Sequence, residues 1–445
     1  LIIKAAGNER DPLENCGPFP GVEYCIYDKS SSMWITSTES RNADYFDGGY
    51  DTVPLKGNAK NILTVGSVAD IPGGYSSSAD VEVSNFSSFG PTDDGRIKPD
   101  IVANGEDLKS ASDSGTGTYT NASGTSMSCP AVTGSIALLI EHFRNTHGYI
   151  PLSSTTKGIV LQTADEAGDD PGPDYKHGWG LMNTRAAGQL ISDDTTLNKH
   201  IVEGELLSGE MDVFFFYVGE GSFDIKATVV WIDPPGTPPS PSLDPVDTIL
   251  VHDLDMRITE LASSTSHYPW ILDPENPEFE ATRGDNYRDN VEQVSIDSPQ
   301  EGWYRLDITH EGVLTEAQSY SLISSIPLVP EGATPDIFCS VDALSVEIFT
   351  GEQGVAQFEL SNSGAGGLDY EIYVPDNSVP SAGLSAVPKR ATSFDISIQP
   401  SGFDVNILGG GEHNIAAMPA SPGNEAYRWD DGLSLIHISE PTRPY

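Results

Sequence analysis

The pattern of hydrophobic and polar positions changes near residue 196. Before that point, short apolar runs such as LIIKAA (residues 1–6), NILTVGSV (61–68) and KPDIVAN (98–104) alternate with helical stretches. Strands that alternate with helices are typical of an α/β fold with a mostly parallel sheet. We therefore expect residues 1–195 to form an α/β region.

The strongest helical pattern is SCPAVTGSIALLIEHFRN, residues 128–145. It is apolar on nearly all sides up to Ile140, and it becomes polar at Glu141, His142 and Arg144. A helix with apolar residues all round is buried, and cations near its C-terminus suit the helix dipole. The pattern predicts a helix that is buried for most of its length and reaches the surface at its C-terminal end.

Beyond the transition the pattern is that of an all-β region. DVFFFYV (212–218), FDIKATVVWI (223–232) and WYRLDITH (303–310) are strand-like runs, separated by turns rich in Pro, Gly, Asp and Asn. Such short, regularly spaced strands predict a β-sandwich or jelly roll over residues 198–328.

The remaining residues divide into a linker, a module and a tail. PLVPEGATP (327–335) is a linker, residues 336–375 predict a partial Ig-like β module, and residues 376–432 predict a low-complexity tail. Residues 433–445, LSLIHISEPTRPY, resemble translated sequencing-adapter read-through and are left out of the fold prediction.

Length and charge narrow the function classes. At 445 residues, about two to four domains are expected at ~150 residues per domain. The formal charge of −43, from 66 acidic and 23 basic residues, argues against a nucleic-acid partner because it repels a phosphate backbone. The longest apolar run, GSIALLIEHF (134–143), falls short of the ~18 residues that a membrane helix needs.

The cysteines point to an oxidising compartment. Cys16 and Cys25 lie in a loop-like stretch, NERDPLENCGPFPGVEYC, and predict a loop-closing disulfide. A metal-binding pair is the alternative, but no second Cys or His pair stands nearby at a ligand spacing. Cys129 and Cys339 are expected to be buried small hydrophobes.

The stretch NASGTSMSCPAVTG (121–134) carries the candidate chemistry. Ser126 stands where a loop of small residues meets the long apolar helix. A helix N-terminus there offers positive potential and unpaired N–H groups to a developing oxyanion, and Gly124 lets a substrate backbone approach. The alternative is that Ser126 is only the N-cap of the helix, a frequent role for serine.

GTSMSCP (124–130) resembles the nucleophile motif of the subtilisin-like serine proteases, the subtilase family. The resemblance implies that Ser126 is the nucleophile and that Gly124 and Thr125 bind substrate. AAGNE (5–9) resembles the oxyanion-hole segment of the family, which implies that Asn8 donates to the oxyanion and that Gly7 contacts substrate. Later segments, at 57–68, 87–105 and 173–187, follow in the order of the family.

Asn8 also has a structural alternative, because Asn after Gly is a common turn residue.

A serine nucleophile needs a general base and an acid that orients it, and in the subtilase family both precede the oxyanion Asn. All nine histidines here follow Ser126. We therefore expect the catalytic Asp and His to lie upstream of this sequence, and the chain alone to be inactive and to fold poorly.

The all-β region also carries a resemblance. ATVVWIDPPG (227–236), DTILVHDLDMRI (247–258) and GDNYRDNVEQV (284–294) resemble the jelly-roll domain that follows the catalytic domain in some subtilases. Carboxylates in its loops and at its strand ends could supply the oxygen ligands of a structural Ca²⁺: Asp233, Asp253, Asp255, Asp285 and Asp289. The alternative is that these residues serve turn chemistry.

The sequence therefore predicts a secreted, extracellular serine endopeptidase that hydrolyses protein or peptide substrates through an acyl-enzyme on Ser126. It is expected to be monomeric at full length and to need no cofactor for the chemistry. The alternative is a catalytically inactive pseudoprotease or an extracellular adhesion module. Reading the upstream sequence for the His and Asp distinguishes these two hypotheses.

Overall fold

A computed structural model describes residues 1–10, 24–28, 33–37, 49–195, 198–219, 221, 223–240 and 245–330, and seven short strands between residues 337 and 437. The chain divides into two compact units. The first contains Leu1–Thr195 and Lys199–Leu328, and the second contains Thr196–Asn198 and Val329–Tyr445.

A parallel sheet forms the centre of the first region. Its strands are β1 (Ile2–Ala5), β4 (Ile62–Val68) and β5 (Ile101–Asn104), in the order β1-β4-β5. Both strand pairs are parallel, and all seven residues of β4 are buried. A strand buried on both faces is typical of a parallel sheet covered by other elements. The arrangement agrees with the predicted α/β fold.

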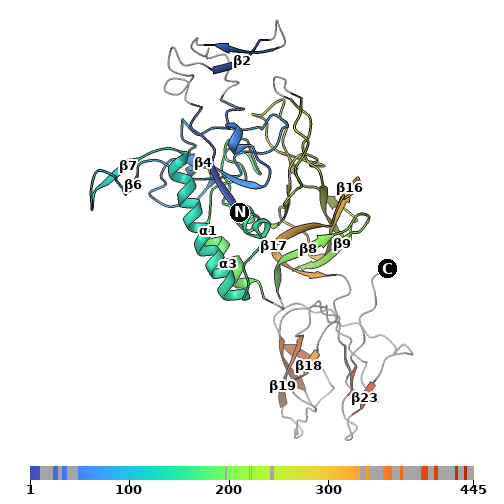
Figure 1. Ribbon diagram of the computed structural model, residues 1–445. Helices are drawn as coiled ribbons and strands as arrows, with labels where there is room; N and C mark the ends of the chain where they lie inside the picture. The colour runs from blue at the N-terminus through green and yellow to red at the C-terminus, as the bar shows by residue number, and fades with distance from the viewer. Residues whose placement is uncertain are drawn as a thin grey trace. The chain divides into compact units, whose positions relative to one another are not determined.

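Three helices accompany this sheet: α1 (Thr125–His147), α2 (Ser153–Gln162) and α3 (Thr184–Asp193). Helix α1 ends at Gly148, whose φ of 83° provides a left-handed C-cap. Helix α1 packs on all three strands of the sheet, and α3 lies beside it (Figure 1).

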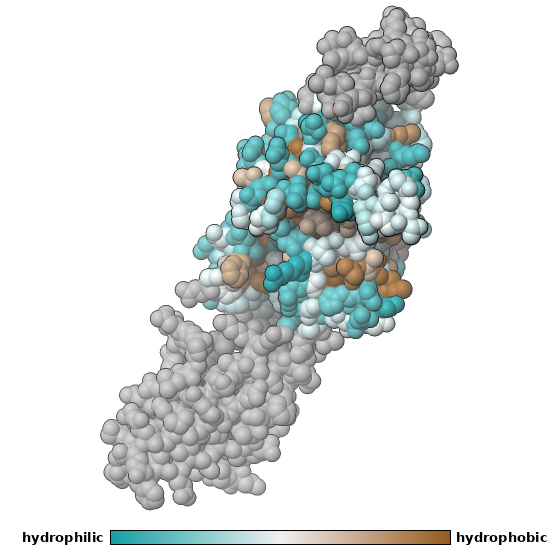
Figure 2. Space-filling model, turned by 90° about the vertical axis from the view of Figure 1, so that its left-hand side faces the viewer, coloured by the Kyte–Doolittle hydropathy of each residue, from teal (hydrophilic) through white to brown (hydrophobic). Residues whose placement is uncertain are grey.

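The prediction that α1 is buried for most of its length is correct for only one of its faces. That face consists of Val132, Ile136, Leu139 and Phe143. On the opposite face Ala131, Gly134 and Ala137 are exposed, and Leu138 is 63% exposed. The sheet contacts α1 from one side, so apolar composition alone did not decide burial. Figure 2 views this side of the molecule and shows apolar residues, in brown, gathered at its surface.

Two hairpins and two short 3-10 helices complete the α/β region. The hairpins are β2 (Tyr24–Asp28) with β3 (Met33–Ser37), and β6 (Leu108–Ala111) with β7 (Tyr119–Ala122). The 3-10 helices are η2 (Leu55–Gly57) and η3 (Ser78–Asp80). The β6–β7 hairpin projects away from α1 in Figure 1, and its chain returns directly to the start of that helix.

The region from residue 199 to 330 is antiparallel, as the sequence predicted. Its main sheet has the order β12-β11-β16-β9-β17-β10-β15, with β8 paired to β17. The strand bounds are β8 Lys199–Leu206, β9 Asp212–Val218, β10 Ile225–Trp231, β11 Asp253–Glu260, β12 Ser266–His267, β15 Val291–Ile296, β16 Gly302–Glu311 and β17 Gln318–Pro330. A small hairpin pairs β13 (Trp270–Ile271) with β14 (Thr282–Arg283). The jelly-roll assignment stays a prediction.

One hydrophobic core joins the α/β and all-β regions. It includes Ile159 and Leu161 of α2 together with Val230, Val291 and Ile323 from the antiparallel sheet. The contact is close, because a Cβ built on Gly158 would lie 2.5 Å from Ile323 Cδ1. The boundary predicted near residue 196 therefore separates two architectures inside one compact unit. A second core lies entirely within the antiparallel region.

The second unit is described only as strands. One sheet has the order β18-β19-β21-β22 and another the order β20-β24-β23. The bounds are β18 Ile337–Cys339, β19 Gly354–Asn362, β20 Glu371–Tyr373, β21 Thr392–Ile398, β22 Val405–Leu408, β23 Ala426–Arg428 and β24 Leu435–His437. Three of these strands lie within residues 376–432, where the sequence predicted a low-complexity tail, and β24 lies within residues 433–445.

The strand in TSFDISI (392–398) has a simple cause, since Phe394, Ile396 and Ile398 alternate with polar residues. The Ig-like assignment of residues 336–375 stays a prediction. The predicted Cys16–Cys25 disulfide falls outside the described residues, because Cys16 is not among them. Cys129, expected to be buried, is a free thiol of intermediate exposure.

Candidate active site

Ser126 lies in the first turn of α1 with its side chain exposed. The N-cap position is held by Gly124, whose φ of 147° is outside the range that L-residues favour. The alternative that Ser126 is the N-cap is therefore wrong. An exposed hydroxyl in the first turn stands among the N–H groups that a helix leaves unpaired at its start.

Asn8 reaches the start of α1 from the end of β1. The Thr125 backbone N–H donates to Asn8 Oδ1 at 2.9 Å, and the Thr125 hydroxyl donates to the same oxygen at 2.8 Å. The Gly7 N–H in turn donates to Thr125 Oγ1 at 3.1 Å. A turn asparagine would bond to its own neighbours, whereas this side chain bonds to a residue 117 positions away. The structure thus brings Gly7, Asn8, Thr125 and Ser126 together.

Two glycines allow this approach. A Cβ built on Gly124 would lie 3.1 Å from Asn8 Nδ2, so the donor end of the amide lies beside the nucleophile loop. Gly124 N–H donates to the Gly105 carbonyl at 2.8 Å, and a Cβ on Gly105 would lie 2.8 Å from the Gly124 carbonyl oxygen. Side chains at these positions would push the loop away from β5.

A buried charged network, which no sequence pattern predicted, lies toward the N-terminal ends of β4 and β5. Asp100 accepts a hydrogen bond from the Thr64 N–H at 2.6 Å and pairs with Lys157 at 2.8 Å and with Lys98. Burial lowers the pKa of Lys98 to about 7. Burial alone would raise the pKa of Asp100, but Lys157 and Lys98 lower it overall. The network joins these two strands to α2.

None of the histidines in the described residues forms a hydrogen bond with Ser126. The His177–Asp174 pair, with 2.9 Å between Nδ1 and Oδ2, looks like part of a catalytic triad. Asp174 also accepts the backbone N–H groups of Lys176 and His177, so the pair closes a local turn. His142 contacts Ser192 Oγ at 2.8 Å near the far end of α1.

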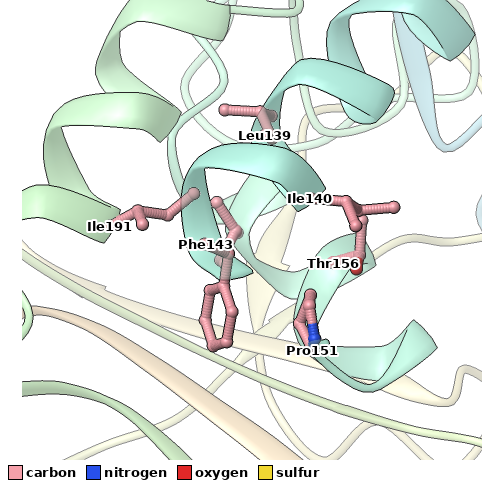
Figure 3. A pocket seen from close by; sticks show the side chains of 7 residues that line it. Leu139, Ile140, Phe143, Pro151, Thr156 and Ile191 are labelled. Atoms are coloured by element: carbon pink, nitrogen blue, oxygen red, sulfur yellow. The ribbon is translucent and has the colours of Figure 1, made fainter. Parts of the chain in front are cut away.

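An apolar pocket lies at the other end of α1 (Figure 3). Its lining comes from α1, α2, α3 and the connection before α2: Leu139, Ile140, Phe143, Pro151, Thr156, Ile159 and Ile191. At ~1.5 Å of rise per residue, Leu139 and Ile140 lie about 20 Å along the helix from Ser126. The pocket is therefore a gap in core packing and has no part in a site at Ser126.

The Ca²⁺ site stays a prediction, and most of the residues expected to form it have other partners. Asp233 is ion-paired with Lys60, and Asp255 and Asp285 share the guanidinium of Arg257. Within the described residues, no group of three or more His, Cys, Asp or Glu side chains is arranged to hold a metal ion. Asp289 Oδ1 instead accepts the Ile97 N–H at 2.9 Å.

Two carboxyl groups near Arg257, those of Asp253 and Asp255, have raised pKa values. Burial, with the nearby charges of Asp255, Asp285 and Glu311, raises the pKa of Asp253 to about 7. Burial and a hydrogen bond with Asp285 raise that of Asp255 to about 6. A carboxyl group with a higher pKa in the folded state binds its proton more tightly when the protein is folded.

We expect the free energy of unfolding to fall as the pH rises from about 4 to 7, because unfolded Asp side chains, with a pKa of ~3.9, lose their protons first. Asp253→Asn should make this decline shallower, since the amide does not titrate. Urea unfolding at several pH values measures it, with the exposed Asp113→Asn as the control. An unchanged decline in the Asp253→Asn variant would contradict the prediction.

Comparisons with known proteins find matches for the region that contains the site. Residues 1–180 match the model of the subtilase family, peptidase S8. The chain is 32% identical over 214 residues to a C5a peptidase of Streptococcus pyogenes serotype M3, which covers 45% of this chain and 18% of that protein. It is 26% identical over 271 residues to the serine protease/ABC transporter B family protein tagA of Dictyostelium discoideum. That match covers 54% of this chain and 15% of the Dictyostelium protein.

Among solved structures, the patellamide maturation protease PatA matches 33% of this chain and 49% of its own, with 26% identity and a TM-score of 0.27. A TM-score this low adds no argument about the fold. The chain spans less than a fifth of the length of the two curated relatives above.

Proposed function

We propose, from the premise that residues 1–180 belong to the subtilase family of serine peptidases, that the protein is an endopeptidase that cleaves peptide bonds through an acyl-enzyme on Ser126. The observation that carries the proposal is the meeting of Asn8 with the start of α1. An amide from a distant strand end and an exposed serine in the first turn of a helix can supply the oxyanion donor and the nucleophile of acyl transfer.

Each residue has a chemical role in this proposal. Ser126 Oγ attacks the substrate carbonyl carbon and passes its proton to a general base, which we expect from sequence upstream of this chain. The carbonyl oxygen becomes an oxyanion that accepts hydrogen bonds from Asn8 Nδ2 and the Ser126 N–H. The amine leaves with a proton from the base, and water then releases the acyl group.

Thr125 has a positioning role. It donates two hydrogen bonds to Asn8 Oδ1, at 2.9 and 2.8 Å, and these hold the carbonyl end of the amide against the helix. The Nδ2 end is then oriented without further reorganisation when the oxyanion develops. Prealigned donors stabilise a transition state more effectively than donors that must first turn.

We place the protein outside the cell and take proteins or peptides as its substrates. The candidate disulfide of Cys16 and Cys25 supports an oxidising compartment. No helix in the described part of the chain is long and apolar enough to cross a membrane. One curated relative is named a C5a peptidase.

A fluorophosphonate probe tests the proposal. Applied to the longer protein that includes the upstream sequence, it should label Ser126, and Ser126→Ala should abolish the labelling. Ser128→Ala is the matched control, because Ser128 lies in the same turn but is fully buried, with its hydroxyl bonded to the Thr125 carbonyl at 3.1 Å.

Peptide mapping should place the adduct on Ser126. Labelling that survives Ser126→Ala, or an adduct on another residue, would overturn the assignment. A protein that folds but takes up no probe would favour the alternative of an inactive binding module.

A further inference from the structure

A group of carboxyl side chains surrounds Arg257 in the antiparallel region. Arg257 lies on β11, and two of the carboxylates lie on the same strand. The other three come from the loop before β15, from β15 and from β16. The members of this carboxylate cluster are Asp253, Asp255, Asp285, Glu292 and Glu311. Five acidic groups around one basic group would be the setting for a bound cation in many proteins.

The guanidinium of Arg257 contacts two members of the cluster directly and lies near a third. Its Nη2 lies 2.8 Å from Asp255 Oδ1 and also bonds to Asp285 Oδ1. Its Nη1 donates to the Met256 carbonyl at 2.9 Å and lies 3.8 Å from Glu292 Oε2. A planar guanidinium can bridge carboxylates in this way because its N–H groups point outward from a fixed fork.

Glu292 is the member that Arg257 reaches least well. Its side chain is fully buried, and Oε2 accepts the Met256 N–H at 2.6 Å. Oε1 is buried and has no hydrogen-bond partner. The other oxygen, Oε2, lies 3.8 Å from Arg257 Nη1, which places the Glu292 carboxylate beside the guanidinium. A buried acceptor without a partner costs free energy that a coordinated cation would recover.

We propose that Arg257 takes the place of a divalent cation in the carboxylate cluster, so that this region is stable without metal and gains a divalent-cation site when the guanidinium is removed. The proposal replaces the Ca²⁺ site expected from the sequence. It rests on where the guanidinium lies and on the buried Glu292 oxygen, and it does not depend on peptidase activity.

The charge balance supports this exchange. Arg257 supplies one positive charge, and its guanidinium contacts the carboxylates of Asp255 and Asp285 directly. Ca²⁺ binds six to eight oxygens at about 2.3–2.6 Å, and it would need the position that the guanidinium holds. Without the guanidinium, Asp255, Asp285 and Glu292 can turn three carboxylates towards one ion.

The test compares the longer protein that includes the upstream sequence with its Arg257→Gln variant, in EDTA and in millimolar CaCl2 near pH 7.5. We expect Ca²⁺ to leave the melting temperature of the unmodified chain unchanged. Arg257→Gln should melt at a lower temperature in EDTA and recover by several degrees in CaCl2. Isothermal titration with CaCl2 should show one site per chain in this variant alone.

Two further variants make the result specific. Arg305→Gln removes an arginine of the same region that pairs with one carboxylate, Asp307, at 2.6 Å, and it should show no response to Ca²⁺. Adding Glu292→Gln to Arg257→Gln should abolish the recovery, because it removes the buried ligand.

Three outcomes would overturn the proposal. One is a Ca²⁺-dependent rise in the melting temperature of the unmodified chain that Asp285→Asn abolishes, since the metal would then bind beside Arg257. Another is a folded Arg257→Gln variant whose melting temperature does not change when Ca²⁺ is added. If the Arg257→Gln variant does not fold in EDTA, refolding in CaCl2 should restore its folded state. The third outcome is that CaCl2 does not restore it.

Discussion

Replacing Asn8 with leucine is expected to lower kcat for peptide cleavage on the order of 10²- to 10³-fold and to leave KM nearly unchanged. Leucine has nearly the shape of asparagine but cannot donate a hydrogen bond. The hydrogen bond from Asn8 forms when the carbonyl oxygen becomes an oxyanion. Its removal therefore destabilises the transition state and leaves substrate binding unchanged. The measurement is steady-state kinetics of the longer protein, which supplies the general base.

Thr125 gives this prediction a second, independent check. Thr125→Val keeps the shape of the side chain but removes the hydroxyl that bonds to Asn8 Oδ1 at 2.8 Å. We expect a smaller fall in kcat than for Asn8→Leu, and recovery in Thr125→Ser, which restores the hydroxyl. Melting temperatures of all variants should be compared, because Asn8→Leu also leaves the Thr125 N–H without its acceptor.

A rise in KM at constant kcat in Asn8→Leu would contradict the oxyanion role. It would indicate that Asn8 binds substrate and transition state equally. An unchanged kcat and KM would reduce Asn8 to a helix-capping residue at the start of α1.

Lys60→Met is expected to destabilise the first compact unit by about 3–5 kcal/mol, because it leaves a buried carboxylate without its counter-charge. The side chains of Lys60 and Asp233 are 7% and 0% exposed, and they form an ion pair between the α/β region and the antiparallel region. Lys60 Nζ also donates to the carbonyls of Pro234 at 2.9 Å and Ile249 at 2.7 Å.

The carboxylate of Asp233 is also held by backbone hydrogen bonds. Asp233 accepts the backbone N–H groups of Val251 at 3.0 Å and His252 at 2.8 Å. The pair therefore organises the connection between β10 and β11 as well as the contact with residues 60–61. Urea unfolding of the longer protein that includes the upstream sequence gives the free energy, and a double-mutant cycle with Asp233→Asn separates the pair from the backbone contacts.

Arg305→Met is the matched control for this prediction. Its ion pair with Asp307 is partly exposed, with side-chain exposures of 36% and 18%, and such pairs contribute about 0–1 kcal/mol. The prediction fails if Lys60→Met costs no more than Arg305→Met. It also fails if the cycle shows no coupling between Lys60 and Asp233.

Local sequence determined much of this protein. Alternating apolar runs were enough to predict the parallel strands before residue 196 and the antiparallel strands after it, because strand and helix periodicity are properties of consecutive residues. The small residues before Ser126 and the apolar stretch after it placed the serine at a helix start, where the structure has it.

Composition alone predicted the burial of side chains less well. Helix α1 is apolar on nearly all sides, yet Leu138 is 63% exposed. Burial depends on which elements pack against a helix, and this is a property of the assembled sheet. The same limit affected Cys129, which lies on α1 and is only partly buried.

Tertiary structure alone decided the contacts between distant residues. Asn8 bonds to Thr125 because β1 ends where α1 begins, and Lys60 meets Asp233 because the two regions share one core. The carboxylates that suggested calcium were visible in the sequence, but the strand register that puts Arg257 among them was not. Sequence periodicity specifies which elements form, whereas sheet register and packing decide which side chains meet and therefore which chemistry a cluster can support.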